Sequence, residues 1–159
     1  MDSKKKEIIE IGKLLWDKDL CSAASGNISV KLDTNTILIT AHDACLGMLT
    51  EDELIALDIQ GTAKTQKMVT TEKPIHLAVH KEFSEVAVIH AHPPFTNGYF
   101  AVRDRLECLT HESRLLLGEV TCLAQDTPSV TDVGKVVEAL KNSNIVILKQ
   151  HGVIAIGET

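Results

Sequence analysis

The sequence lacks the features of a membrane-spanning, secreted or nucleic-acid-binding protein. No apolar stretch approaches the length of about 18 residues that suggests a membrane span. The lysine-rich start is followed by acidic residues, unlike a signal peptide. The net charge is −6, whereas nucleic acid is normally bound by a basic stripe. We therefore expect neither a membrane nor a nucleic-acid partner.

Cysteine and aromatic residues are also scarce. The sequence has four scattered cysteines and no CxxC pair, which favours reduced thiols in a cytoplasmic protein over a disulfide framework. Aromatic residues make up only 3% of the chain and hydrophobic residues 44%. The core must therefore be aliphatic, and a cytoplasmic location is expected.

The length of 159 residues fits one domain that spans residues 1–159. Apolar residues at helical spacing predict helices over 4–19, 73–83, 95–103 and 132–141. Apolar or β-branched runs between turn residues predict strands over 28–32, 36–40, 54–59, 86–92, 120–124, 145–148 and 153–156. Helices and strands are mixed and hairpins are frequent, so we expect an α/β fold with a mixed, mainly antiparallel sheet covered by helices.

Two histidines have the spacing of neighbours on one face of a strand. Side chains at i and i+2 point the same way, so His90 and His92 should project together. Two such imidazoles can chelate one ion at about 2.0–2.1 Å each, and catalytic zinc usually has three protein ligands and one open position. The candidate for the third ligand is His151, which lies in a Gln150-His151-Gly152 turn between two apolar strands.

A second histidine pair competes as a metal site. His76 and His80 lie at i and i+4 on one face of the predicted helix over 73–83, a spacing that also suits zinc. No HExxH pattern is present, and the apolar residues between the two histidines indicate ordinary packing. We interpret His76 as a residue that supports a site or the fold, and His80 as a surface residue.

Two short segments have the composition of anion-binding sites. In Ser25-Gly26-Asn27, glycine permits a close approach of the backbone, and amide and hydroxyl groups supply hydrogen-bond donors. Thr70-Thr71-Glu72 precedes a predicted helix, where free N–H groups favour a phosphate. The first segment is equally an ordinary loop, and the second is equally an ordinary helix start. The residues alone leave both interpretations open.

Five ordered motifs resemble those of the class II aldolase/adducin family. They are Ser25-Gly26-Asn27-Ile28-Ser29, Leu38-Ile39-Thr40, Thr70-Thr71-Glu72 with Pro74 and His76, His90-Ala91-His92, and Gln150-His151-Gly152. The set covers nearly the whole chain, and it is far more specific than any single motif. The resemblance implies a three-layer α/β/α sandwich around a largely antiparallel sheet. It also implies a homo-oligomer, commonly a four-fold tetramer with active sites at subunit interfaces.

The same resemblance implies roles for individual residues. It gives a zinc ion (Zn2+) the ligands His90, His92, His151 and a displaceable Glu72. Glu72 would also serve as the acid–base residue. The substrate phosphate would be held by Gly26, Asn27, Thr70 and Thr71. The implied reaction cleaves a sugar phosphate, a ketose 1-phosphate such as L-fuculose 1-phosphate, into dihydroxyacetone phosphate and an aldehyde. Zinc would stabilise the enediolate.

Three features depart from the family pattern. The usual Thr-Pro-Ser/Thr-Gly loop is replaced by Thr40-Ala41-His42-Asp43, and an aspartate there would repel phosphate unless the loop turns it away. His111 stands where some relatives carry a tyrosine, so it is a candidate second proton donor. Relatives commonly continue into C-terminal helices, which we expect to be lacking after Thr159. A neighbouring subunit would then cover the apolar strand over 153–156, close to His151.

Other activities of this scaffold remain open. A ribulose-phosphate 4-epimerase is disfavoured, because such enzymes carry aspartate where this chain has Glu72. A methylthioribulose-phosphate dehydratase would keep the glutamate and the histidines. A non-catalytic adducin-like binding protein would have lost the metal ligands, which this chain retains. The sequence does not identify the aldehyde or the metal.

Overall fold

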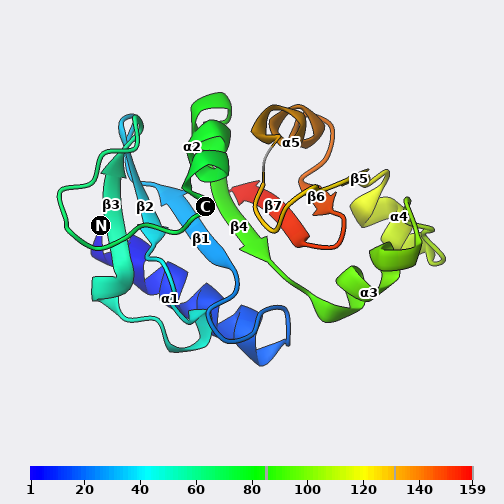
Figure 1. The fold of residues 1–159 in the computed structure, drawn as a ribbon, viewed down its shortest axis with the longest axis horizontal. Coiled ribbons are helices and arrows are strands. Elements are labelled where there is room, and N and C mark those ends of the chain that lie inside the picture. Colours follow the sequence, from blue (N-terminus) through cyan, green and yellow to red (C-terminus); the bar gives the residue numbers. More distant parts are fainter. Residues whose placement is uncertain (85, 131, 159) are drawn as a thin grey trace.

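The computed structural model describes residues 1–84, 86–130 and 132–158. Its helices are α1 (Asp2–Asp17), η1 (Leu46–Met48), η2 (Glu51–Glu53), α2 (Lys73–Glu82), α3 (Pro94–Val102), α4 (His111–Leu117) and α5 (Val133–Leu140). Its strands are β1 (Asn27–Lys31), β2 (Thr36–Thr40), β3 (Leu54–Asp58), β4 (Val86–Ala91), β5 (Thr121–Leu123), β6 (Ile145–Leu148) and β7 (Gly152–Glu158). Figure 1 shows the strands side by side with helices around them.

The seven strands form one sheet in the order β3-β2-β1-β4-β7-β6-β5. β5 pairs with β6 in parallel, whereas the other neighbouring pairs are antiparallel. The α/β class is therefore confirmed. The expectation of a mainly antiparallel sheet is corrected to a mixed sheet, because the β6 neighbour at one edge runs parallel to it.

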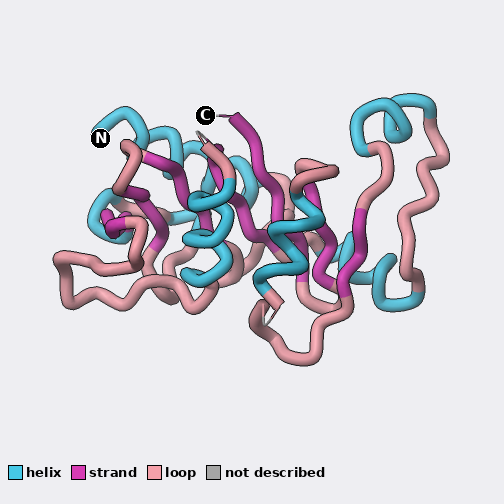
Figure 2. Tube along the Cα trace, turned by 90° about the horizontal axis from the view of Figure 1, so that it is seen from above, coloured by secondary structure: helices cyan, strands magenta, loops and turns pink. Residues whose placement is uncertain are grey.

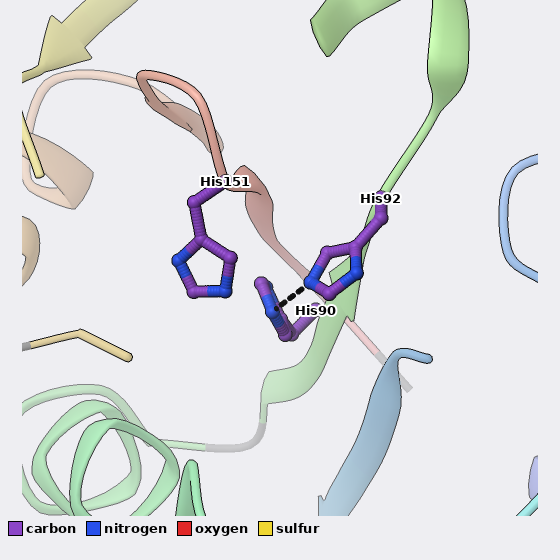
Figure 3. A group of neighbouring side chains, drawn as sticks. All are labelled: His90, His92 and His151. Atoms are coloured by element: carbon purple, nitrogen blue, oxygen red, sulfur yellow. Dashed lines mark hydrogen bonds between the residues drawn. The ribbon is translucent and has the colours of Figure 1, made fainter. Parts of the chain in front are cut away.

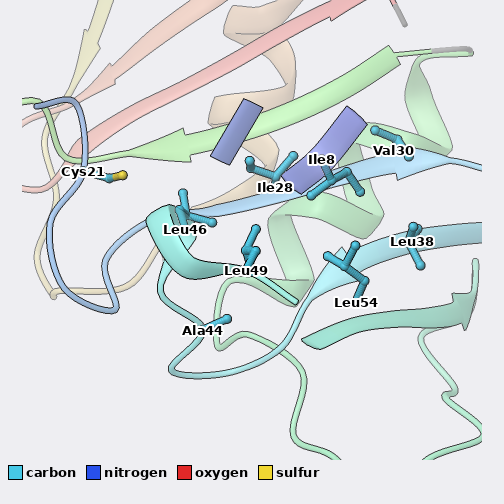
Figure 4. Packing of buried hydrophobic residues seen from close by; sticks show 9 residues of the cluster. All are labelled: Ile8, Cys21, Ile28, Val30, Leu38, Ala44, Leu46, Leu49 and Leu54. Carbon is cyan, nitrogen blue, oxygen red and sulfur yellow. The ribbon is translucent and has the colours of Figure 1, made fainter. Parts of the chain in front are cut away.

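One face of the sheet packs against α1 and η1. Ile8 of α1 meets Ile28 and Val30 of β1 in an aliphatic cluster that also contains Leu46 of η1 (Figure 4). Alternation along β1 places these isoleucine and valine side chains on one face and their neighbours on the other. Farther along the same face, Phe100 of α3 packs in a second cluster over β6 and β7.

The opposite face packs against α2 and α5. Ile75 of α2 and Val136 of α5 are fully buried and share a cluster with Val88 of β4 and Ile154 of β7. The same face carries Asn27 and Ser29 of β1, so polar groups lie next to this apolar cluster. The polar residues of the site therefore come from the α2 side of the central strands.

The α1 face is incompletely covered near the end of β7. An apolar hollow of about 360 Å³ is lined by residues of α1, β1, β4 and β7, including Ile11, Ile89 and Ala155. Ile11 is 39% exposed there. Figure 2 shows a separate lobe at the other end of the molecule, made of α4 and the loops beside it. No described helix has the length and apolarity needed to cross a membrane.

Most of the predicted helices and strands lie within a few residues of the observed ones. The predicted strand over 86–92 ends at Ala91, so His92 follows the strand directly. Helix α4 was not predicted. It has seven residues, none of them buried, and Thr110 caps it through Ser113 where a capping box usually has glutamate or glutamine. It therefore has neither a periodic core face nor the usual start signal.

Candidate metal centre

Two of the three predicted metal ligands come from the end of β4. His90 is almost completely buried, and His92 is half-buried just beyond the strand. Their Nε2 atoms lie 2.7 Å apart, so both rings point into the same small space (Figure 3). The prediction that the pair projects together is confirmed.

The third histidine is brought in by a tight turn between β6 and β7. The His151 N–H donates to the Leu148 carbonyl at 3.0 Å, and Gln150 adopts a positive φ of 60°. Asn97 of α3 donates its amide N–H to the His151 carbonyl at 3.0 Å. Gly152 is required here, because a Cβ would clash with the Ala91 carbonyl and the His92 ring. The turn therefore fits closely against the end of β4.

The three imidazoles form one cluster. One ring nitrogen from each of His90, His92 and His151 lies within 4.8 Å of the others. The ring centroids are 4.6 Å apart for His90 and His92, 4.7 Å for His90 and His151, and 5.0 Å for His92 and His151. The rings meet at steep angles of 77°, 67° and 54°. They converge on a point and are not stacked.

The cluster is electrically neutral near pH 7. Burial, together with the neighbouring histidines, lowers the pKa of His90 to about 3. Burial likewise lowers the pKa of His92, and burial with the His92 ring lowers that of His151 to about 4. Neutral imidazoles keep a lone pair for a metal ion, so protonation does not compete with metal binding at neutral pH.

The donor set fits a divalent metal of the zinc type. The His90 Nδ1–H donates to the Val153 carbonyl at 2.9 Å, which fixes the tautomer and leaves the Nε2 lone pair directed toward the His92 ring. Such a backbone partner is usual for a metal-binding histidine. Among the described residues, His151 Nδ1 is buried without a hydrogen-bond partner. Three imidazoles are one of the usual sets of protein ligands at a catalytic zinc site.

Glu72 lies at the start of α2, outside the group of three histidines. It is the N-cap residue and is 6% exposed. Burial raises the pKa of its carboxyl above the ordinary value of 4.5, and the carboxylate accepts the Val130 N–H at 3.4 Å. Among the described residues, the clustered donor atoms are those of the three histidines. Glu72 as a fourth ligand stays a prediction.

The Gly26-Asn27 segment lies directly beside His90. Gly26 adopts a positive φ of 87°, and a Cβ on it would be 2.9 Å from the His90 carbonyl oxygen. Asn27 pairs with His90 across β1 and β4, so the two side chains share the α2 face. The structure thus brings one predicted phosphate segment next to the histidine cluster.

The second predicted phosphate segment is tied to the same region through Thr40. The Thr70 N–H donates to the Thr40 carbonyl at 3.4 Å, and the Thr40 hydroxyl accepts the Ile28 N–H at 3.3 Å. Thr70 is buried, whereas Thr71 is exposed. Asp43 adopts a φ of 58°, the conformation that glycine favours, and its side chain is 80% exposed. The loop thus exposes the aspartate to solvent.

His111 is not brought to the cluster within one chain. It is the first residue of α4 and is exposed. It lies in the separate lobe (Figures 1 and 2) and outside the group formed by the three histidines. His111 as a second proton donor stays a prediction.

The interpretation of His80 as a surface residue is wrong. His76 and His80 are both 0% exposed and share the hydroxyl of Ser29. The i and i+4 spacing was visible in the sequence, but only the packing of α2 on β1 buries both rings. The available signal was Ser29 at an alternating strand position, on the same face as Asn27.

The sequence matches a family profile and several proteins of known name. The profile of the family described as Class II Aldolase and Adducin N-terminal domain matches residues 6–159. L-fuculose phosphate aldolase of Methanococcus vannielii is 30% identical over 155 residues, which cover 97% of this chain and 84% of the relative. 3-oxo-tetronate 4-phosphate decarboxylase of Haemophilus influenzae is 24% identical, with coverage of 98% and 77%.

A solved structure shares the fold at similar identity. L-fuculose-1-phosphate aldolase of Thermus thermophilus superposes with a TM-score of 0.87 at 28% identity, covering 100% of this chain and 82% of the other. The family match extends over nearly the whole chain and includes the segments that carry all three histidines. This chain belongs to the class II aldolase and adducin family.

Proposed function

We propose that the protein is a zinc-dependent aldolase that cleaves a ketose 1-phosphate of the L-fuculose 1-phosphate type to dihydroxyacetone phosphate and an aldehyde. Its family and its fuculose-phosphate aldolase relatives support a metal-dependent class II aldolase, a carbon–carbon lyase. The observation that carries the proposal is the convergence of three neutral imidazoles beside Gly26 and Asn27.

The cluster defines where the reacting end of the substrate would lie. His90, His92 and His151 would hold one zinc-like ion per chain, with Glu72 as a displaceable ligand. A bound zinc ion supplies Lewis-acid stabilisation of the negative charge that develops on the adjacent substrate oxygens. No lysine Schiff base is needed for this chemistry.

Glu72 is the proposed acid–base residue. Its carboxyl is buried at the start of α2, and burial raises its pKa. A carboxyl with a raised pKa is better matched to proton transfer near neutral pH than an ordinary glutamate. The Glu72 carboxylate would take a proton from the substrate or return one to carbon. The Val130 N–H orients the carboxylate through its hydrogen bond.

The phosphate of the substrate would be bound by Gly26, Asn27, Thr70 and Thr71. Gly26 brings the backbone close to β4, and Asn27 stands opposite His90. The start of α2 adds the positive end of the helix dipole. These local donors would offset the overall negative charge of the chain.

We further propose that the active form is a cytoplasmic homo-oligomer, with a tetramer as the expected assembly. Large apolar side chains are exposed on α3, α4 and the segment between them, namely Phe95, Val102, Leu109, Leu115 and Leu116, each at least 72% exposed. Exposed apolar patches of this kind commonly mark protein interfaces. The Asn97 side chain of α3 donates a hydrogen bond to the His151 carbonyl, so an interface on α3 would lie close to the metal centre. A neighbouring copy could then supply His111 as the second proton donor.

Light scattering tests the oligomer. The wild-type protein should be larger than a monomer at micromolar concentration, and a double change of Leu115 and Leu116 to lysine should lower the apparent mass. Leu14→Lys on α1 is the matched control, because Leu14 is 51% exposed on another surface. A stable wild-type monomer would contradict the proposed assembly.

A decarboxylase or dehydratase on the same scaffold is the alternative function. The Haemophilus influenzae decarboxylase relative covers nearly the whole chain, although at lower identity than the aldolase relative. A non-catalytic adducin-like role is disfavoured by the intact cluster of three histidines.

The decisive experiment combines metal analysis with a substrate screen. Purified protein should contain about one zinc-like ion per chain and should release dihydroxyacetone phosphate from at least one ketose 1-phosphate. 3-oxo-tetronate 4-phosphate and methylthioribulose 1-phosphate belong in the same screen. Turnover of either one, without cleavage of any ketose 1-phosphate, would replace the aldolase assignment.

A further inference from the structure

A chain of buried polar groups extends from Asn27 away from the metal centre. Asn27 Oδ1 lies 2.5 Å from His76 Nε2, and His76 Nδ1 lies 2.6 Å from Ser29 Oγ. Ser29 Oγ in turn lies 2.7 Å from His80 Nε2. Ser29, His76 and His80 are each 0% exposed, and Asn27 is 6% exposed. The proposed reaction does not need Ser29, His76 or His80 to hold the metal or to move a proton.

The imidazoles of His76 and His80, which belong to this series of hydrogen bonds, are neutral. Burial and the nearby histidines lower the pKa of His76 well below 6.5. Burial and the charge of Lys31 lower the pKa of His80 to about 4. A neutral ring carries one N–H and one lone pair, so each ring donates at one nitrogen and accepts at the other. The far end of the chain, His80 Nδ1, is buried and has no hydrogen-bond partner among the described residues.

The unpartnered His80 Nδ1 decides in which direction these hydrogen bonds run from donor to acceptor. In one direction His80 Nε2–H donates to Ser29, Ser29 donates to His76 Nδ1, and His76 Nε2–H donates to Asn27 Oδ1. This direction leaves only a lone pair unused on His80. The reverse direction places a proton on His80 Nδ1, where no described acceptor exists. A buried N–H without an acceptor is rare in proteins, which disfavours the reverse direction.

A third arrangement of the protons is disfavoured because it also leaves a buried proton without an acceptor among these groups. If both His76 and His80 donated to Ser29 Oγ, the hydroxyl proton of Ser29 would have neither ring nitrogen as an acceptor. The hydroxyl can donate to only one of the two rings. The first direction is therefore the one in which every buried proton of the chain is hydrogen-bonded.

We propose that Ser29 and His76 are positioning residues that hold the Asn27 carboxamide with its oxygen toward His76 and its NH2 group toward the bound anionic group of the substrate. This rests on the proposed function, in which Asn27 contacts the phosphate. An asparagine amide is nearly symmetrical in shape, so an unrestrained side chain can present either end. The carbonyl end would repel a phosphate, whereas the NH2 end donates a hydrogen bond. Because Asn27 pairs with His90, the amide stands beside the metal centre.

The tautomers can be measured on the unaltered protein. Long-range ¹H–¹⁵N NMR of zinc-loaded protein with ¹⁵N-labelled histidine distinguishes the protonated ring nitrogen of each neutral imidazole. Both His76 and His80 should carry the proton on Nε2. A proton on Nδ1 of His76 would overturn the proposal, whatever reaction the enzyme catalyses.

Variants test whether the orientation of the Asn27 amide affects phosphate binding. Ser29→Ala removes the hydroxyl that sets the His76 tautomer, so the zinc-loaded variant should bind inorganic phosphate about tenfold more weakly, the size expected for one hydrogen bond to a charged group. Its zinc content should be unchanged. For a cleaved ketose 1-phosphate, KM should rise with little change in kcat, because the phosphate is remote from the bond that breaks.

A matched pair at His76 separates hydrogen bonding from packing. His76→Gln retains an N–H donor for Asn27 and should keep most of the phosphate affinity, whereas His76→Phe fills the space without a donor and should lose it. Val79→Ala is the control, because Val79 is buried on the same helix but apolar. It should lower thermal stability without weakening phosphate binding.

The outcomes separate this proposal from the proposed function. Equal phosphate affinity in the two His76 variants, equal weakening by Ser29→Ala and Val79→Ala, or no phosphate binding by the unaltered protein would each overturn it. If Ser29→Ala does not fold, the two His76 variants and the tautomer measurement still decide. If no ketose 1-phosphate is cleaved but the tautomers and phosphate affinities are as expected, the aldolase assignment falls and this proposal stands.

Discussion

The two faces of strands β1 and β4 differ sharply in chemistry. On the α1 face, Ile28 and Val30 lie in an aliphatic cluster (Figure 4), and Ile89 packs against it. On the α2 face, the intervening positions carry Ser29 and His90, which take part in directed hydrogen bonds. A single residue step along the strand thus separates apolar packing from the site.

The difference shows how one short strand can serve two purposes. Apolar burial is non-directional, so the α1 face stabilises the fold without requiring one exact geometry. The α2 face depends on distances and proton positions, and each buried polar group there needs a partner. Changes to the apolar residues of the α1 face should therefore alter stability, and changes to the polar residues of the α2 face should alter binding and turnover.

The largest effect is expected at His90. His90→Ala removes the most buried member of the cluster, so two imidazoles remain and both bound metal and activity should be lost. Elemental analysis alongside an activity assay measures this. Val88→Ala, on the same face of β4, should keep its metal. Full metal occupancy in His90→Ala would contradict the ligand assignment.

Glu72 should affect turnover strongly and stability weakly. Glu72→Gln keeps the shape of the side chain but removes the titrating group, so turnover should fall by about 10²-fold or more. In the wild type, the acid limb of the turnover profile should lie above pH 4.5, because burial raises the pKa of this carboxyl. Glu53→Gln, in the capping box of η2, is a control for a purely structural carboxylate. Unchanged turnover in Glu72→Gln would indicate a structural role only.

A cavity in the apolar cluster on the α1 face should lower stability and leave metal content and KM unchanged. Leu38→Ala truncates a side chain that is 1% exposed in the aliphatic cluster. The free energy of unfolding should fall by about 2–5 kcal/mol, the usual range for this truncation, while metal content and KM stay unchanged in the folded protein. Denaturant unfolding measures the loss, and Leu14→Ala on the exposed side of α1 is the control. A raised KM at equal metal content would show that the two faces are coupled.

The smallest effect concerns the pH dependence of stability. The unfolded chain binds a proton at His80 near pH 6.5, whereas the folded chain does so only near 4. The unfolded state therefore holds more protons between these values, so the free energy of unfolding falls as the pH is lowered through this window. His80→Gln retains an N–H donor for Ser29 but does not titrate.

Between pH 7 and pH 5, the wild type should lose about 2 kcal/mol more stability than His80→Gln. Urea unfolding at the two pH values measures this difference. The other buried histidines are present in both proteins, so their contributions cancel. An equal loss in both proteins would mean that the His80 ring is accessible to protons in the folded state.

Much of the histidine cluster could be predicted from the sequence. The i and i+2 spacing of His90 and His92 places both rings together because a strand alternates every residue, whatever it packs against. The turn that carries His151 was marked by its adjacent glycine, which the structure shows to be sterically required. The hairpin of β1 and β2 was likewise marked by the turn residues between them.

The place of other residues depended on contacts between distant parts of the chain. The sequence determined the α/β class, the order of most elements and the histidine pair, because these follow from local spacing and alternation. Only the tertiary structure decided that His80 is buried, that Ser29 joins two rings 47 and 51 residues away, and that His111 lies outside the cluster in its own chain. Burial and hydrogen bonding between remote segments depend on how helices pack on a sheet, which local spacing does not specify.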